Sequence, residues 1–213
     1  MKILMVAGGE LNEELLSDIY RGFSEPPFVI GIDKGCRALY GQGIHINLAV
    51  GDFDSVGEFY ERVVSSAEEI IELNPVKDDT DTEAAVMQAL KRKPEEVMIF
   101  GALGRRADHM LANIYLLGRF MQNDIPACIV DKCNRIRLIK NELRLQRDDA
   151  FGKYVSVIPY GDHIASLTLK GFKYKADGLK LDKCSSRGVS NEITDEVGII
   201  ITSDPAIVIE SRD

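Results

Sequence analysis

The chain has 213 residues, of which 45% are hydrophobic and 28% charged, a balance that excludes disordered, collagen-like and coiled-coil proteins. Its 34 acidic residues outnumber its 26 basic residues, and the surplus lies entirely in the first half. Residues 1–106 carry 19 acids and 11 bases, whereas residues 107–213 carry 15 of each. Because an acidic half repels nucleic acid and anionic lipid, we expect no nucleic-acid partner and no membrane partner. A protein of this charge that handled phosphates would need metal ions.

The start of the chain is a short apolar run that ends at Gly8 and Gly9. The run is too short for a signal peptide, and no apolar stretch reaches membrane-spanning length. The cysteines show neither CxxC pairing nor the neighbouring ligands of a zinc site; they are Cys36, Cys128, Cys133 and Cys184. We therefore expect buried free thiols in a reducing compartment, and so a cytoplasmic protein.

Strand and helix patterns alternate over the first 131 residues. Short apolar runs predict strands at residues 3–7, 28–32, 47–50, 70–73, 97–100 and 127–131. Helical periodicity predicts helices at residues 11–23, 56–65, 80–91 and 107–121. Such an alternation predicts a parallel sheet covered by helices on both faces, Rossmann-like in its arrangement. Loops at the carboxyl ends of its strands then gather along one edge.

The pattern changes after about residue 133. Short strand candidates follow at residues 135–139, 154–159, 165–169, 172–175, 192–194, 198–202 and 206–210, with little helical periodicity between them. Strands of this length, separated by Gly, Asp and Asn, are typical of an antiparallel β-sandwich. We therefore expect an α/β domain over residues 1–135 followed by a β-sandwich over residues 136–213.

Carboxylates cluster in three places where the loops of the predicted parallel sheet converge. Asp52 and Asp54 follow one strand, and in an extended segment their side chains point the same way, with backbone origins about 6–7 Å apart. Asp33 ends another strand. The stretch 78–83 opens a helix with four acids in six positions, more than a helix N-cap needs. Paired hard oxygen ligands favour Mg²⁺, although an ordinary acidic turn explains Asp52 and Asp54 nearly as well.

The stretch 101–109 supplies positive charge opposite these acids. It follows a predicted strand and begins a helix, so its backbone N–H groups favour an anion. Arg105 and Arg106 add bidentate phosphate contacts, although a tight turn with a solvated arginine pair explains the same residues. Neither GxGxxG nor GxxxxGK[ST] is present. Together the acids and cations predict a Mg²⁺-dependent enzyme that acts on a nucleotide, without indicating the acceptor.

The order of these motifs resembles the thiamine pyrophosphokinases of bacterial type. The motifs are Asp33 with Gly35, then GDFDS at 51–55, KDDTD at 77–81, GRRADH at 104–109 and GVSNE at 188–192. The resemblance implies transfer of the pyrophosphoryl group of ATP, the co-substrate, to thiamine, giving thiamine diphosphate and AMP, with Mg²⁺ as cofactor. It also implies that the first domain binds ATP and Mg²⁺, that the second binds thiamine, and that a homodimer forms its active sites between subunits.

The resemblance further implies roles for single residues. The expected Mg²⁺ ligands are Asp52, Asp54 and Asp78, and the expected catalytic residues are these three with Asp81, Arg106 and Asp108. Nucleotide and cofactor contacts are expected from Gly9, Asp33, Gly35, Lys77, Thr80, Gly104, Arg105 and His109. Thiamine contacts are expected from Ser186, Ser190 and Asn191, although without the resemblance the last two would be interpreted as a hairpin turn.

The sequence also departs from the family pattern. Arg105 stands where a glycine is usual, and Lys34 follows Asp33 where a glycine is common. Some relatives stack thiamine on a tryptophan, which this chain lacks, and Phe172 and Tyr174 are equal candidates to replace it. A pyrophosphokinase for another alcohol and a non-catalytic nucleotide- or thiamine-binding regulator remain alternative functions. Nucleotide preference, the number of metal ions and the identity of a general base stay open.

Overall fold

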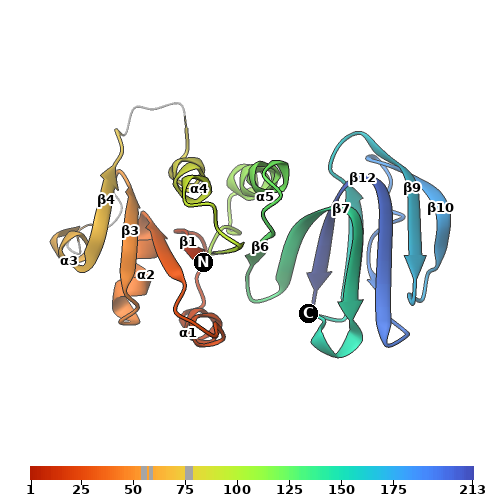
Figure 1. The fold of residues 1–213 in the computed structure, drawn as a ribbon, viewed down its shortest axis with the longest axis horizontal. Helices are drawn as coiled ribbons and strands as arrows, with labels where there is room; N and C mark the ends of the chain where they lie inside the picture. Colours follow the sequence, from red (N-terminus) through yellow and green to blue (C-terminus); the bar gives the residue numbers. More distant parts are fainter. Residues whose placement is uncertain (54–56, 58–59, 75–78) are drawn as a thin grey trace. The chain divides into compact units, whose positions relative to one another are not determined.

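The computed structural model describes residues 1–53, 57, 60–74 and 79–213. Three residues with predicted roles, Asp54, Lys77 and Asp78, lie outside the described residues. The chain forms two compact units, Met1–Lys132 and Cys133–Asp213 (Figure 1). Each unit has its own secondary-structure class, and each is described by itself below.

The first unit alternates strands with helices. Its strands are β1 (Lys2–Val6), β2 (Phe28–Ile32), β3 (Ile46–Gly51), β4 (Ala67–Glu72), β5 (Glu96–Phe100) and β6 (Ala127–Val130). Its helices are α1 (Glu13–Arg21), α2 (Lys34–Gly41), α3 (Tyr60–Ser66), α4 (Asp81–Lys91) and α5 (Ala107–Gln122). The strands pair in parallel in the order β6-β5-β1-β2-β3-β4. The predicted parallel α/β fold is confirmed.

Apolar strands buried on both faces form the centre of this unit. In β1 the side chains of Leu4 and Val6 join a core with Leu16 of α1 and Leu39 of α2. The alternating residue Met5 points to the opposite face and is equally buried. A parallel sheet requires this double cover, since its crossover helices lie on its faces.

Helix α2 was not predicted from the sequence. Its eight residues include Gly35 and Gly41, and glycine lowers intrinsic helix propensity. The structure gives the reason for Gly35, because a Cβ atom at this position would lie 1.9 Å from the carbonyl oxygen of Val6. Close packing of the helix against β1 therefore requires glycine at position 35.

The second unit contains only strands and one short 3₁₀ turn (Arg147–Asp149) among regular elements. The strands are β7 (Asn134–Gln146), β8 (Tyr154–Pro159), β9 (His163–Lys170), β10 (Ala176–Asp182), β11 (Asn191–Glu192) and β12 (Val197–Ser211). Strand β12 pairs with β7 along most of its length, with β9 in its first part and with β8 in its second part. All these pairs are antiparallel, as predicted for this part of the chain.

The long strand β12 changes partner where its register shifts, between Thr202 and Ala206. Such irregularities bend a strand, and beyond the shift β8 replaces β9 as the second neighbour of β12 while β7 stays beside it. The side chains of Val157 on β8 and Leu167 on β9 join one apolar core with Ile200 and Val208 of β12. This core between two antiparallel layers corresponds to the predicted β-sandwich.

Two strand predictions were wrong in detail. Residues 172–175 form no strand, since only Phe172 makes an isolated bridge, with Ile193, and the strand β10 follows instead. Phe172 is 1% exposed in the core, so its apolar signal came from burial and not from strand pairing. Residues 198–202 and 206–210, predicted as two strands, both belong to β12.

The four cysteines are free thiols, but only Cys36 is fully buried. Burial, and next the negative charge of Asp33, raises the pKa of the Cys36 thiol to about 12. Cys184 is exposed, so the expectation of four buried thiols was wrong for this residue. In the described part of the chain, no helix has the length and apolar character needed to cross a membrane.

Candidate active site

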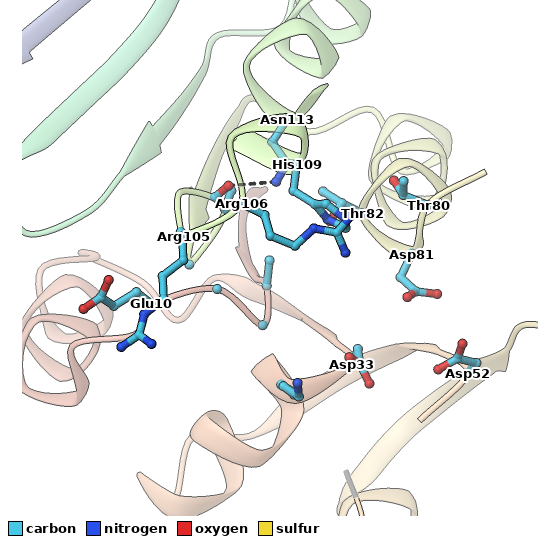
Figure 2. A pocket seen from close by; sticks show the side chains of 17 residues that line it. Glu10, Asp33, Asp52, Thr80, Asp81, Thr82, Arg105, Arg106, His109 and Asn113 are labelled. Atoms are coloured by element: carbon cyan, nitrogen blue, oxygen red, sulfur yellow. Dashed lines mark hydrogen bonds between the residues drawn. The ribbon is translucent and has the colours of Figure 1, made fainter. Parts of the chain in front are cut away.

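A cleft of about 690 Å³ opens at the carboxyl ends of the strands of the first unit. Its lining comes from the loops after β1, β2, β3 and β5 and from the start of α4 (Figure 2). Strand β1 lies between β5 and β2, so the chain winds away from it in both directions. Ligands of open α/β sheets bind at such a point.

One end of the cleft is acidic. Asp33, Asp52 and Asp81 come from three different elements and lie at the same end of the cleft in Figure 2. Asp33 has a positive φ of 46°, its backbone N–H donates to the carbonyl of Val50 at 3.0 Å, and a Cβ atom on Gly51 would lie 3.2 Å from its backbone. The absence of a side chain at Gly51 therefore allows the loops that carry Asp33 and Asp52 to approach each other.

Helix α4 contributes its first turn to the cleft. The hydroxyl oxygen of Thr80 accepts the backbone N–H of Glu83 at 3.2 Å, which is ordinary N-terminal capping. This leaves Asp81, the first residue of the helix, beside the cleft with Thr82. Thr80 therefore caps the helix and also lines the cleft, and Asp81 and Thr82 line the cleft beside it.

The predicted Mg²⁺ ligands lie partly outside the described residues. Of the three predicted ligands the structure describes Asp52, whereas Asp54 and Asp78 fall outside the described residues. Among the residues that are described, no group of three or more His, Cys, Asp or Glu side chains is arranged to hold a metal ion. The carboxylate oxygens of Asp33, Asp52 and Asp81, which line the same cleft, have the hard donor chemistry that suits Mg²⁺.

Glycine backbone forms one wall of the cleft. The N–H of Gly9 donates to the carbonyl of Gly101 at 2.8 Å, and a Cβ atom at Gly9 would lie 2.3 Å from that oxygen. The loops after β1 and β5 therefore touch, and a ligand can approach their backbone closely. Gly104 also lines the cleft, whereas Gly35 does not and packs against β1 instead.

Arg106 already has an ionic partner inside the protein. Its Nη2 lies 2.7 Å from Oδ2 of Asp108, its Nε donates to Oδ1 at 3.2 Å, and the N–H of His109 also donates to Oδ1. The hydrogen bond from Arg106, followed by that from His109, lowers the pKa of Asp108 to about 2. Asp108 is exposed and does not itself line the cleft, whereas Arg106 and His109 do.

Two other cations of the cleft are differently placed. Arg105 and Lys34 are exposed and line the cleft, and neither side chain makes a hydrogen bond or ion pair within the described part of the chain. In Figure 2 Arg105 points away from Arg106, toward the side of the cleft where Glu10 lies. These two side chains are available to an anionic ligand.

Sequence reasoning missed several cleft residues: Glu10, Lys34 as a cleft cation, Thr82 and Asn113. Asn113 is 8% exposed and donates to the carbonyl of Ala102 at 2.7 Å, the bond drawn in Figure 2, so it steadies the loop before Gly104. It follows His109 by four residues on α5, the spacing that places two side chains on one helix face. That spacing was the available signal.

The residues predicted to contact thiamine all lie in the second unit. Ser186 and Ser190 are exposed, whereas Asn191 is 6% exposed and its side-chain amide bonds to the backbone of Tyr174. Tyr174 is 63% exposed and Phe172 only 1%, so only Tyr174 offers its ring to a ligand.

The first unit is a parallel α/β fold with a cleft at its strand ends. The cleft carries carboxylates on one side and glycine backbone with cations on the other. This is the arrangement of a nucleotide-dependent phosphoryl-transfer enzyme. Two family models match the chain. The thiamin pyrophosphokinase catalytic domain matches residues 21–129, and the thiamin pyrophosphokinase vitamin B1 binding domain matches residues 140–208.

Known relatives are similar over nearly the whole chain. Thiamine pyrophosphokinase of Bacillus subtilis is 36% identical over 193 residues, which covers 90% of this chain and 89% of the relative. A crystal structure of the B. subtilis protein superposes with a TM-score of 0.89 at 34% identity and covers all of both chains. A thiamin pyrophosphokinase family protein from Enterococcus faecalis, also covering all of both chains, gives a TM-score of 0.85 at 30% identity.

The chain therefore belongs to the thiamin pyrophosphokinase family, whose reaction forms thiamine diphosphate by pyrophosphoryl transfer from ATP.

Proposed function

We propose that this protein transfers the pyrophosphoryl group of ATP to the hydroxyl of thiamine and releases AMP. The observation that carries the proposal is the cleft of the first unit. Carboxylates from three elements gather at one end of it, and its lining also includes glycine backbone and two cations that have no ion-pair partner among the described residues. A nucleotide polyphosphate needs both kinds of partner, since its phosphates are anionic and its transfer requires charge neutralisation.

The phosphates bind along the glycine wall and the start of α5. The backbone N–H of Gly104 and the N-terminus of α5 favour anions, and Gly9, whose own N–H is bonded to Gly101, lets a phosphate approach the backbone closely. Arg105 and Lys34 supply positive charge that no group in the described chain neutralises. Arg106 contributes less in the unliganded state, because a phosphate must compete with Asp108 for its guanidinium.

Asp52, together with Asp54 and Asp78 of the undescribed stretches, is proposed to hold Mg²⁺, and Asp33 and Asp81 add carboxylates at the same end. When bound, Mg²⁺ neutralises charge on the phosphate oxygens. The oxygen of the thiamine hydroxyl attacks the β-phosphorus, and the bond from that phosphorus to the oxygen bridging to the α-phosphorus breaks. AMP leaves with the bridging oxygen, and a cleft aspartate accepts the hydroxyl proton.

The second unit is proposed to bind thiamine and to form a homodimer with active sites between subunits. The register of β12 places Ile207 opposite Leu138 and Ile158, on the face turned away from the core residues Val157 and Val208. Ile207 is already buried within the chain, whereas its neighbours Leu138 and Ile158 are half-buried and leave apolar surface for a partner to cover. A molar mass of twice 23.7 kDa in light scattering would support the dimer. Four free thiols fit the proposed cytoplasmic location.

The deciding experiment incubates the protein with Mg²⁺, ATP and thiamine and resolves the products by chromatography. AMP together with thiamine diphosphate supports the proposal. ADP with thiamine monophosphate would instead indicate a monophosphate kinase. Turnover only with another alcohol would indicate a pyrophosphokinase whose acceptor is not thiamine. Saturable binding of ATP or thiamine without any product would favour a regulator.

A further inference from the structure

The segment 190–193 of the second unit lies between two neighbours. On one side Asn191 pairs with Val155 of β8. On the other side Phe172 forms a bridge with Ile193, and the N–H of Lys173 donates to the carbonyl of Glu192 at 2.9 Å. The backbone on either side of Asn191 is therefore held against residues 172–174, which are distant in sequence.

The side chain of Asn191 extends this backbone pairing. Its Oδ1 accepts the N–H of Tyr174 at 3.0 Å and that of Glu192 at 2.9 Å, and its Nδ2 donates to the carbonyl of Tyr174 at 2.8 Å. The amide thus occupies the place of a peptide group and binds both polar backbone atoms of Tyr174. Because it is 6% exposed and satisfied within the protein, this amide positions its neighbour instead of contacting a substrate.

Ser190 is held by a second buried polar side chain. Its φ of 58° lies in the left-handed region, which is unfavourable for a non-glycine residue. Its N–H donates to Oγ of Ser156 at 3.0 Å, and Ser156 is 7% exposed. The hydroxyl of Ser190 itself is on an exposed residue and makes no hydrogen bond within the described chain.

The backbone of Tyr174 is held in place while its ring is exposed. The residue is 63% exposed although Asn191 fixes its backbone on both sides. The ammonium of Lys173 lies 5.7 Å from the ring centroid and forms an ion pair with Glu192 at 2.8 Å, which lowers the pKa of Glu192. An exposed aromatic ring on an anchored backbone is a surface on which a flat aromatic cation can stack.

We infer that Asn191 and Ser156 are positioning residues, which hold the Tyr174 ring and the Ser190 hydroxyl as the pair that contacts thiamine. Thiamine carries a positively charged thiazolium ring and an aminopyrimidine ring with polar edges. The Tyr174 ring suits stacking against a flat ring, and the Ser190 hydroxyl suits a hydrogen bond to a polar edge. The inference rests on the proposed function and identifies which groups of the second unit recognise its acceptor.

The first test measures steady-state kinetics of four variants: Asn191→Ala, Ser156→Ala, Tyr174→Ala and Ser190→Ala. Each is expected to raise the KM for thiamine about tenfold and to leave the KM for ATP within about twofold. Ser156→Thr keeps the hydroxyl oxygen and should restore the KM for thiamine. A purely structural role would instead lower kcat or alter both KM values together.

Ser203→Ala is the matched control for Ser156→Ala. Its Oγ accepts the backbone N–H of Ser166 at 2.9 Å, so the variant loses the same kind of bond in the same unit. This bond joins β9 to the irregular part of β12, whereas Ser190 bonds to Ser156 of β8. The KM for thiamine should therefore not change in this variant. An equal rise in both variants would contradict the inference.

The second test observes binding without turnover. The chain contains no tryptophan, so Tyr174→Trp introduces a single tryptophan, which can be excited selectively over tyrosine and whose emission thiamine should quench in the absence of ATP. Adding Asn191→Ala to this variant should move the quenching midpoint about tenfold higher in thiamine concentration. An unchanged midpoint, or no quenching by thiamine, would overturn the inference.

Failure of the inference is distinguishable from failure of the proposed function. If the wild-type protein forms thiamine diphosphate and Tyr174→Ala leaves the KM for thiamine unchanged, only the inference is overturned. Tyr174 is exposed, so this variant tests the pair even if Asn191→Ala does not fold. Wild-type protein that forms no thiamine diphosphate refutes the proposed function, while the fluorescence titration still decides whether thiamine binds at Tyr174.

Discussion

The two units differ in whether their functional or buried charged side chains have ion-pair partners within the described chain. In the first unit, cations such as Arg105 and Lys34 line a cleft without a partner in the described chain. In the second unit, Glu210 is 0% exposed and binds Arg135 at 2.8 Å and Arg137 at 2.9 Å. The first arrangement leaves charge for a ligand to neutralise, and the second neutralises charge within the fold.

This difference has a consequence for substitutions. Removing a charge from the cleft should impair the reaction and leave stability nearly intact, because the cleft groups are solvated before the ligand arrives. Removing the buried charge of Glu210 from the sandwich should lower stability and leave nucleotide binding intact, because its mostly covered arginine partners would lose their counter-charge. Cleft variants should therefore lose activity, and sandwich variants should lose stability.

The largest effect is expected for Asp52→Asn. Turnover should fall about a thousandfold, since several kcal/mol of charge stabilisation are lost at the phosphates. The melting temperature should stay close to that of the wild type. Asp18→Asn is the control, since Asp18 lies outside the cleft and pairs only with Arg21 at 3.7 Å on the surface of α1. Near-normal turnover of the Asp52 variant would remove this residue from the metal site.

Glu210→Gln should give the largest loss of stability. Its carboxylate also accepts the N–H of Phe151 at 3.1 Å, so the variant leaves two arginines and one backbone group poorly paired. We expect a loss of about 3 kcal/mol in the free energy of unfolding, measured with urea. Glu142→Gln removes an exposed partner of Arg144 and should cost less than about 1 kcal/mol. Equal losses would contradict the comparison.

Helix α2 contains a matched pair of glycines. Gly35→Ala should lower stability by about 1–3 kcal/mol, because the added Cβ would overlap the carbonyl of Val6 and force the helix to move. Gly41→Ala has no atom within 4 Å of the added Cβ and should raise stability by about 0.5–1 kcal/mol. Thermal unfolding of both variants decides whether packing against β1 requires Gly35. Equal destabilisation by both variants, or none by Gly35→Ala, would contradict this requirement.

Arg105→Gly introduces the residue usual in the family. The KM for ATP should rise about tenfold and kcat should change little, because an unpaired cation that contacts phosphate contributes charge-assisted hydrogen bonds. Arg105→Lys should keep part of the affinity. The effect should shrink in 0.5 M salt, which screens exposed charges. An unchanged KM for ATP would place Arg105 outside the nucleotide contacts.

The smallest effect concerns Asp108, the cleft-edge carboxylate that is neutralised internally. Its pKa of about 2 lies below the ordinary 3.8, so its pairing with Arg106 is fully present above about pH 4 and is lost as pH falls through about 2. The pH–rate profile between pH 5 and 9 should therefore show no step from Asp108. NMR titration of the carboxyl carbon should find the low pKa, and Arg106→Ala should raise it. A wild-type pKa near 3.8 would contradict the ion pair.

Sequence reasoning succeeded where a property depends on neighbours along the chain. The buried strands 3–7 and 28–32 were found because a parallel sheet covered on both faces requires continuous apolar runs. The loop positions of Asp33, Asp52 and Arg105 followed from the strands before them. Helix α2 was missed, because its glycines are selected by contact with β1 and oppose local propensity.

The charge surplus of residues 1–106, the family motifs and the alternation of strands and helices were determined by the sequence alone. Only the tertiary structure decided which groups are available to a ligand. Arg106 is paired with Asp108, whereas Arg105 has no partner in the part of the chain that the structure describes. Phe172 is buried and Tyr174 is exposed, and the amide of Asn191 binds Tyr174. The physical reason is that residue type and spacing specify what a side chain can bind. Whether it is already bound depends on contacts between segments that are distant in the chain.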